Sequence, residues 1–123
     1  IRCKRKAMFA IKAHYFKKCE WFKPGKKIMV IGTGAVGKML VTALGKEEIK
    51  VDGFINNDHF NKKGTLKGLP IHFLNEDNAS QFFSKQKNTF YISAVGVPAG
   101  KKKIHQLLQQ HHLKAGYDYL KFI

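Results

Sequence analysis

The chain has 123 residues, 44% hydrophobic and 25% charged, a balance typical of a single globular domain and unlike that of a disordered protein. Its three prolines and eleven glycines exclude collagen-like and proline-rich material. No apolar run approaches the roughly 20 residues that cross a bilayer, since the best one covers residues 28–31. The two cysteines make no disulfide framework, and we therefore expect a reducing, cytoplasmic location.

Positive charge is concentrated near the start of the chain. The 23 Lys and Arg residues and 8 Asp and Glu residues give a formal net charge of +15. Residues 1–27 hold ten basic groups and one acid, or +9, and residues 28–123 hold thirteen and seven, or +6. This excess favours an anionic partner such as nucleic acid, anionic lipid or a phosphate-bearing ligand, although a solvated lysine-rich surface explains it equally well. The chain opens at Ile1 without a signal-peptide pattern, and we expect it to be cut from a longer protein.

The first predicted element is a helix over residues 4–22, which Pro24-Gly25 ends. Its apolar residues recur at spacings of three and four: Met8, Ile11, Tyr15 and Cys19, with Phe9 and Phe16 beside them. This side predicts docking on the following domain or on an absent catalytic domain. Because the helix is also basic, the alternative is contact with an anionic membrane surface. We expect docking, since the apolar face is short and His14 interrupts it.

Strand and helix patterns alternate through the rest of the chain. Strands are predicted over 27–31, 50–55, 70–74, 89–95 and 117–122, and helices over 35–44, 75–85 and 99–112. Asn75 would cap the second of these helices, with Glu76 and Asp77 in its first turn. The alternation predicts an α/β, Rossmann-like three-layer domain over residues 27–123, with a five-strand parallel sheet of order 3-2-1-4-5. An extra N-terminal helix, the basic amphipathic connecting segment over residues 1–26, would precede it.

The strongest motif is Gly32-Thr33-Gly34-Ala35-Val36-Gly37, which follows an apolar strand and opens a helix. Gly32 would permit the tight turn, Gly34 would let the backbone approach a pyrophosphate, and Gly37 would let helix and strand pack closely. The helix N-terminus would then offer N–H groups to the anion. The motif therefore predicts nucleotide-type binding. The alternative is that the glycines serve only the turn and the packing around an empty pocket.

The end of the second predicted strand bears on the choice of nucleotide. An acid about 20 residues past the glycines would grip the ribose of NAD, but Asn56 stands there, followed by Asn57 and Asp58. An amide can bind a hydroxyl without supplying a charge. A 2′-phosphate of NADP would need a basic residue, and Lys62 and Lys63 are only loosely placed for it.

A second glycine-containing loop, Gly96-Val97-Pro98-Ala99-Gly100, follows the fourth predicted strand. In a doubly wound sheet this loop faces the first one across the ligand crevice, so Gly96 and Val97 are expected to form the far wall. Lys101-Lys102-Lys103 come next, against the preference of a helix N-terminus for acids. These lysines would either bind an anion or simply be solvated.

The sequence offers little catalytic chemistry. The six histidines show no metal-ligand spacing with Cys or acids, and we find no nucleophile elbow, phosphate-binding Walker loop or paired carboxylates. We therefore expect no catalytic residue and no metal site. Cys3 and Cys19 are interpreted as free thiols, and Trp21 and Phe22 as staples of the first helix onto the core.

Residues 27–123 resemble small Rossmann-like domains of bacterial surface-polysaccharide and sugar-modifying proteins. Beyond the first glycine motif, the resemblance is carried by Gly53-Phe54-Ile55-Asn56-Asn57-Asp58, Lys63-Gly64, Gly68-Leu69-Pro70-Ile71, Ala94-Val95-Gly96-Val97-Pro98-Ala99-Gly100 and Ala115-Gly116-Tyr117-Asp118-Tyr119-Leu120. In this order the motifs are similar to the C-terminal domain of some bacterial family-two glycosyltransferases. Asn56 departs from that pattern, in which Asp is usual.

The resemblance implies a transferase parent with its catalytic domain elsewhere in the same chain, working in the cytoplasm or at the inner face of the membrane. This fragment would be a non-catalytic domain that binds a nucleotide or nucleotide-sugar. A sugar acyltransferase is one alternative, because its N-terminal substrate-binding domain looks similar through Gly68-Leu69-Pro70-Ile71. The other is an NAD(P)-binding oxidoreductase domain. Nucleic-acid binding would rest on charge alone, and we do not expect it.

Overall fold

The computed structural model describes residues 2–18, 26–56, 64–86, 88–95, 98–115 and 118–121. The helices are α1 (Arg2–Lys18), α2 (Ala35–Lys46), α3 (Ala79–Lys85) and α4 (Pro98–Gln110). The strands are β1 (Lys27–Ile31), β2 (Gly53–Asn56), β3 (Thr65–Leu66), β4 (Leu69–Phe73), β5 (Thr89–Ser93) and β6 (Tyr119–Lys121). Among the described helices, none combines the length and apolar composition needed to span a bilayer.

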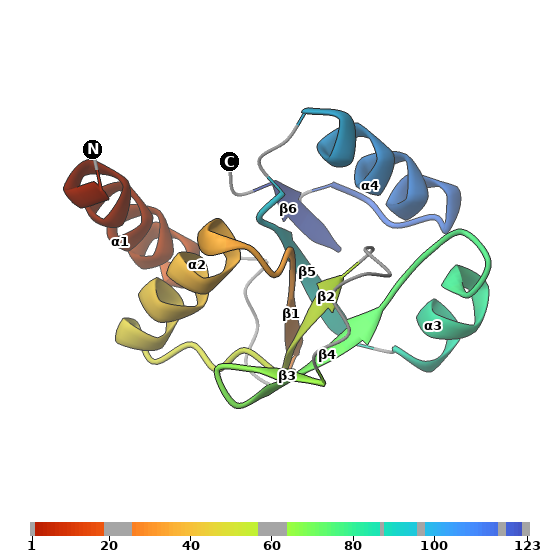
Figure 1. The fold of residues 1–123 in the computed structure, drawn as a ribbon, viewed down its shortest axis with the longest axis horizontal. Helices are drawn as coiled ribbons and strands as arrows, with labels where there is room; N and C mark the ends of the chain where they lie inside the picture. The colour runs from red at the N-terminus through yellow and green to blue at the C-terminus, as the bar shows by residue number, and fades with distance from the viewer. Residues whose placement is uncertain are drawn as a thin grey trace.

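The protein has an α/β fold around a mixed, mostly parallel sheet (Figure 1). Within the described ranges the sheet has six strands in the order β3-β4-β2-β1-β5-β6, and all neighbours are parallel except β3 and β4. The prediction of a five-strand, all-parallel sheet of order 3-2-1-4-5 is therefore corrected. The added edge strand β3 forms a hairpin with β4 through Lys67 and Gly68, which both adopt positive φ. Two residues are too few to produce a periodicity in the sequence.

Two hydrophobic cores lie on opposite faces of the sheet, because successive side chains of a strand point to opposite sides. Ile28 and Val30 of β1 belong to the core beneath α1 and α2, whereas Met29 and Ile31 belong to the core beneath α3 and α4. This burial on both faces explains why β1 is a continuous apolar run. Figure 1 shows the resulting layers, with α1 and α2 on one side of the sheet and α3 and α4 on the other.

The N-terminal helix packs against α2, but not through the apolar stripe that the spacing predicted. Phe9, Ala13 and Phe16 are buried in the core beneath α1 and α2, and the Phe16 ring lies 5.7 Å from that of Phe90 in β5. The predicted stripe of Met8, Ile11 and Tyr15 is exposed instead. Cys19 and the predicted end of the helix lie outside the described residues. The division of the chain into residues 1–26 and 27–123 stays a prediction.

The third helix begins later than predicted. A turn formed by residues 75–78 precedes α3, in which the Asn75 backbone N–H donates to Asn78 Oδ1 and the Asn78 N–H donates to Asn75 Oδ1, at 2.8 and 2.9 Å. Glu76 and Asp77 therefore lie in this turn, and Asn78 rather than Asn75 precedes the helix. Asx side chains compete with helix formation in this way by offering the backbone a local partner.

Candidate functional site

The first glycine motif forms the turn between β1 and α2 at the carboxyl edge of the sheet. Gly32 adopts a φ of +121°, which L side chains rarely tolerate. Its N–H donates to the Ile55 carbonyl of β2 at 2.9 Å, and the Ala94 N–H beyond β5 donates to the Ile31 carbonyl at 2.8 Å. These bonds hold the turn between the ends of β2 and β5. In a parallel sheet this is where ligands bind.

The two glycines that follow have different structural roles. A Cβ added to Gly37 would lie 2.1 Å from the Gly32 carbonyl oxygen, so only glycine permits this contact between α2 and the turn. A Cβ added to Gly34 would meet no atom within 4 Å. Gly37 is therefore required by packing, as the motif predicts. Packing within the described chain does not require a glycine at Gly34.

The beginning of α2 is not capped by a side chain. Gly34 occupies the N-cap with φ −79° and ψ −167°, and the first turn holds no acid. The first backbone N–H groups of any α-helix lack partners within the helix and attract anions. Lys38, which is exposed, follows within the next turn. This end of α2 is therefore electropositive and open above Gly34.

The structure brings only part of the predicted ribose site to this turn. Asn56 ends β2 and is buried, and its carbonyl accepts a hydrogen bond from the Leu74 N–H at 3.0 Å. It lies next to Ile55, whose carbonyl binds Gly32, so Asn56 is at the same edge as the glycines. Asn57 and Asp58 lie outside the described residues, as do Lys62 and Lys63.

The far wall of the crevice is also only partly described. A Cβ on Gly32 would lie 3.3 Å from the Ala94 carbonyl oxygen, which places the end of β5 directly beside the turn. Gly96 and Val97 lie outside the described residues. Beyond them α4 returns close to the strand, since a Cβ on Gly100 would lie 3.0 Å from Val95 Cγ1. The end of β5 is thus a neighbour of the glycine turn, since β1 and β5 are adjacent strands of the sheet.

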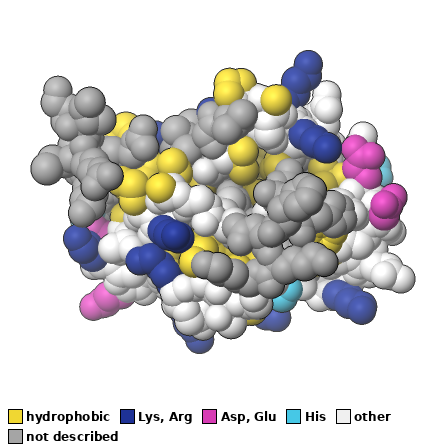
Figure 2. Space-filling model, viewed as in Figure 1, with side chains coloured by type: hydrophobic (Ala, Val, Ile, Leu, Met, Phe, Trp, Pro, Cys, Tyr) yellow, Lys and Arg dark blue, Asp and Glu magenta, His cyan; other side chains and the backbone are white. Residues whose placement is uncertain are grey.

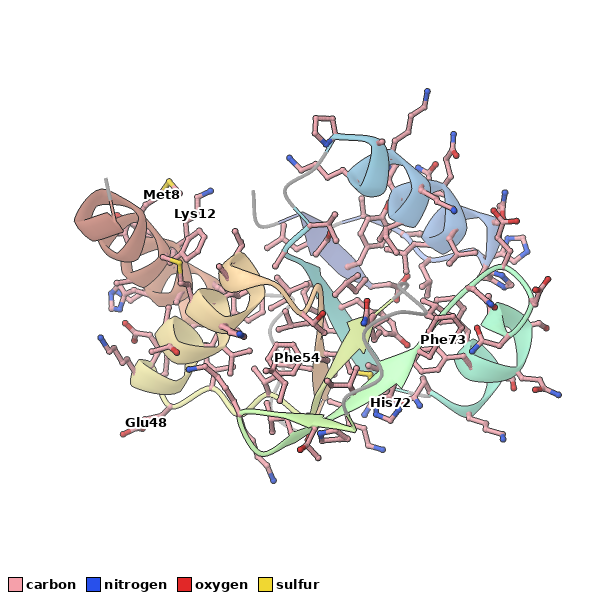
Figure 3. All side chains as sticks on the ribbon, in the orientation of Figure 1. Met8, Lys12, Glu48, Phe54, His72 and Phe73 are labelled. Carbon is pink, nitrogen blue, oxygen red and sulfur yellow. The ribbon has the colours of Figure 1, made fainter. Side chains whose placement is uncertain are left out.

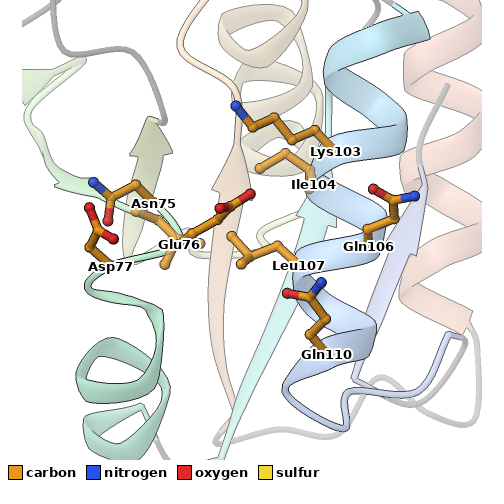
Figure 4. A pocket seen from close by; sticks show the side chains of 9 residues that line it. Asn75, Glu76, Asp77, Lys103, Ile104, Gln106, Leu107 and Gln110 are labelled. Atoms are coloured by element: carbon orange, nitrogen blue, oxygen red, sulfur yellow. The ribbon is translucent and has the colours of Figure 1, made fainter.

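A cavity of about 210 Å³ that the sequence did not indicate lies between α4 and the turn before α3 (Figure 4). Glu76 extends from that turn toward α4, and Lys103 lies on the opposite wall (Figure 4). The remaining wall is mixed: Leu74, Asn75, Asp77, Ile104, Gln106, Leu107 and Gln110. Lys103 thus shares its cavity with two carboxylates, an arrangement that does not select an anion. Its lining residues come from distant segments, so no local pattern could reveal it.

The sequence did not indicate two buried tyrosines, Tyr91 and Tyr119. The Tyr119 hydroxyl lies 2.9 Å from His105 Nδ1. The Tyr91 hydroxyl, also buried, has no hydrogen-bond partner among the described residues. Burial, reinforced by the negative charge of Asp118, raises the pKa of Tyr91 far above its ordinary value. Neither tyrosine lies at the glycine turn, because both belong to the core beneath α3 and α4.

Within the described ranges no three His, Cys, Asp or Glu side chains gather closely enough to hold a metal ion.

The carboxyl edge of the sheet combines a glycine turn, an uncapped helix and a neighbouring strand end. Such a surface can bind phosphate groups through backbone N–H donors. The chain matches no protein-family model and no curated protein sequence.

Proposed function

We propose that this chain is a non-catalytic, Rossmann-like domain that binds a nucleotide or nucleotide-sugar, and that it forms part of a glycosyltransferase of surface-polysaccharide synthesis. The observation that carries the binding proposal is the free space over Gly34 at the uncapped start of α2. The glycosyltransferase context rests on the order of motifs along residues 27–123. The nearest alternatives remain the substrate-binding domain of a sugar acyltransferase and an NAD(P)-binding oxidoreductase domain.

In this proposal each part of the turn has a distinct role. Gly34 and the first N–H groups of α2 would receive the diphosphate, because a backbone without a Cβ allows the closest approach. Asn56 would face the ribose from the end of β2. Gly96 and Val97, which follow Val95 in the chain, would close the far side.

Titration calorimetry with UDP-glucose, NAD and NADP tests this proposal. We expect heat of binding from at least one of these diphosphates, and preference for UDP-glucose would favour the transferase context. The variant Gly34→Val should weaken binding at least tenfold, since its side chain would occupy the diphosphate site. Val is compatible with the extended backbone at Gly34, so the melting temperature should stay close to that of the wild type.

The matched control is Gly64→Val, the same substitution at another glycine whose Cβ would meet no atom within 4 Å. Gly64 precedes β3, away from the glycine turn. Binding should survive this change. Absence of heat from all three diphosphates, with a cooperative melting transition, would contradict the proposal and indicate that the glycines serve packing alone.

We also propose that the fragment transfers neither hydride nor sugar. The described residues present no metal-binding cluster and no arrangement of an acid and a base at the glycine turn. Incubation of the purified chain with UDP-glucose, or with NAD and a hydride donor, should yield no product above the buffer control. Turnover that Gly34→Val abolishes would contradict the non-catalytic assignment.

A further inference from the structure

We propose that the outer face of the α1–α2 layer docks on a lipid surface with anionic headgroups. This face combines an exposed apolar stripe on α1 with lysines from α1, α2 and the β3–β4 turn. The proposal goes beyond nucleotide binding and does not depend on it, because this face lies on α1, α2 and the β3–β4 turn and shares only Lys38 with the surroundings of the glycine turn.

The apolar stripe consists of Met8, Ile11 and Tyr15, which are 39%, 58% and 65% exposed. Their spacing of three and four residues places them in one row along the helix. The helix buries a different row, Phe9, Ala13 and Phe16, so the exposed row is not needed to attach α1 to the domain. Large apolar side chains that are exposed singly need no explanation, whereas a continuous row marks an interaction surface.

Basic residues accompany the stripe. Among the described side chains of α1, three are basic and exposed, Lys12, Lys17 and Lys18, and none is acidic. Figure 3 shows Lys12 beside Met8 on the upper side of α1. Of the acids near this layer, Glu47 lies 3.3 Å from His14 Nδ1, and Glu48 is exposed after the end of α2. The charge of the surface is therefore complementary to anionic headgroups.

A groove of about 350 Å³ runs between the two helices, on the side of α1 that carries Ala10. Its apolar part comes from Ala10, Met39 and Ala43, and its polar part from Lys38, Thr42, Lys46 and Lys67. Lys67 Nζ donates to Thr42 Oγ1 at 2.7 Å, which holds the turn lysine over α2. On the left of Figure 2, hydrophobic side chains lie over this layer with Lys or Arg side chains next to them. An apolar floor with a cationic rim suits the boundary between acyl chains and headgroups.

A lipid surface accounts for both features of this face, whereas nucleic acid accounts for one. Phosphates of DNA or RNA would attract the lysines, but they give an aliphatic row such as Met8 and Ile11 no favourable environment. A bilayer interface lowers the free energy of the apolar row by burial and of the lysines by attraction. Substitution of the apolar row therefore separates the two classes of partner.

Vesicle co-sedimentation of the full chain tests the proposal. We expect binding to equimolar phosphatidylserine–phosphatidylcholine vesicles at low salt, and little binding to pure phosphatidylcholine. Ile11→Ser combined with Tyr15→Ser should reduce partitioning at least tenfold with an unchanged melting temperature. Lys38→Gln, Lys46→Gln and Lys67→Gln together should reduce it about a hundredfold, from roughly fivefold for each lysine. The control is Lys85→Gln, Lys102→Gln and Lys114→Gln, which removes the same charge from exposed sites on and after α3 and α4.

Several outcomes would overturn the proposal. These are no binding to anionic vesicles, equal losses in the two lysine triple variants, or undiminished binding after the serine substitutions. The last result together with tight binding of a single-stranded DNA probe would indicate a nucleic-acid surface. A second copy of the chain could also occupy this face, and sedimentation velocity tests for it. A dimer that the serine substitutions dissociate would contradict lipid docking. If the serine variant does not fold, comparison of vesicle binding by the two lysine triple variants still tests the proposal.

Discussion

The two faces of the sheet are covered by helices that occupy different places in the chain. On one face both helices, α3 and α4, connect successive strands of the sheet. On the other face only α2 connects two strands, and α1, which precedes every strand, covers the rest. The comparison shows that a helix outside the strand–helix alternation completes a layer of the fold. It does so with Phe9 and Phe16, and its remaining apolar row faces outward.

The functional features divide between the same two faces. The glycine turn opens α2, and the basic, apolar surface lies on the outside of α1 and α2. The other face carries a mixed-charge cavity between α4 and the turn before α3, and the buried Tyr91 hydroxyl, which has no hydrogen-bond partner among the described residues. The following substitutions test whether each face is held together as its contacts indicate.

The largest effect is expected for Phe16→Ala in α1. Removing a ring that is 3% exposed and packs against Phe90 should lower the free energy of unfolding by about 3–5 kcal/mol. The matched control is its neighbour Tyr15→Ala, which should change stability by no more than about 0.5 kcal/mol because the side chain is exposed. Urea unfolding measures both. Equal effects would contradict the role of α1 as part of the layer.

A smaller loss is expected for Gly37→Ala in α2. The added Cβ would collide with the Gly32 carbonyl and force the turn and the helix apart, at about 1–3 kcal/mol. Gly45→Ala, on the same helix with free space around its Cβ, should instead raise stability by about 0.5–1 kcal/mol. A stabilising Gly37→Ala would show that the close contact between α2 and the turn does not exist.

The smallest effect is expected on the opposite face, where the hydroxyls of two buried tyrosines differ in their hydrogen-bond partners among the described residues. Tyr119→Phe should cost about 0.5–1.5 kcal/mol, because it removes the contact with His105. Tyr91→Phe should be neutral or stabilising by up to about 1 kcal/mol, because it removes a buried hydroxyl that has no hydrogen-bond partner in the described part of the chain. A clear loss of stability in Tyr91→Phe would indicate that the hydroxyl has a partner.

The raised pKa of Tyr91 gives this residue a pH signature as well. In the unfolded chain the phenol ionises near pH 10, whereas burial in the folded chain keeps it protonated to higher pH. Its contribution is therefore complete below about pH 10 and is lost as the pH rises beyond that value. The stability of the wild type should fall more steeply above pH 10 than that of Tyr91→Phe. Parallel curves would contradict the burial of this hydroxyl.

Sequence patterns predicted the parts of the fold that depend on local periodicity and on glycine. The apolar run of β1, the helix after it and the close approach at Gly37 all follow from local residues. The buried side of α1 could not be predicted in this way, because the helix carries two apolar rows with spacings of three and four residues, the phenylalanine row and the exposed row. Only the surroundings of Phe90 in β5 decide that the phenylalanine row is buried. The two-residue β3 and the cavity between α4 and the turn before α3 depend on pairings between short or distant segments.

The most direct test of the binding proposal is a map of amide chemical-shift changes by NMR as UDP-glucose is added to the full chain. We predict that the largest changes fall on Gly34 through Gly37, at the start of α2, with smaller ones at Ala94 and Val95. The changes should saturate and should be absent in Gly34→Val. If the largest changes fall instead on Asn75 and Lys103, which line the cavity between α4 and the turn before α3, or if no amide at the glycine turn responds, the proposed site is wrong.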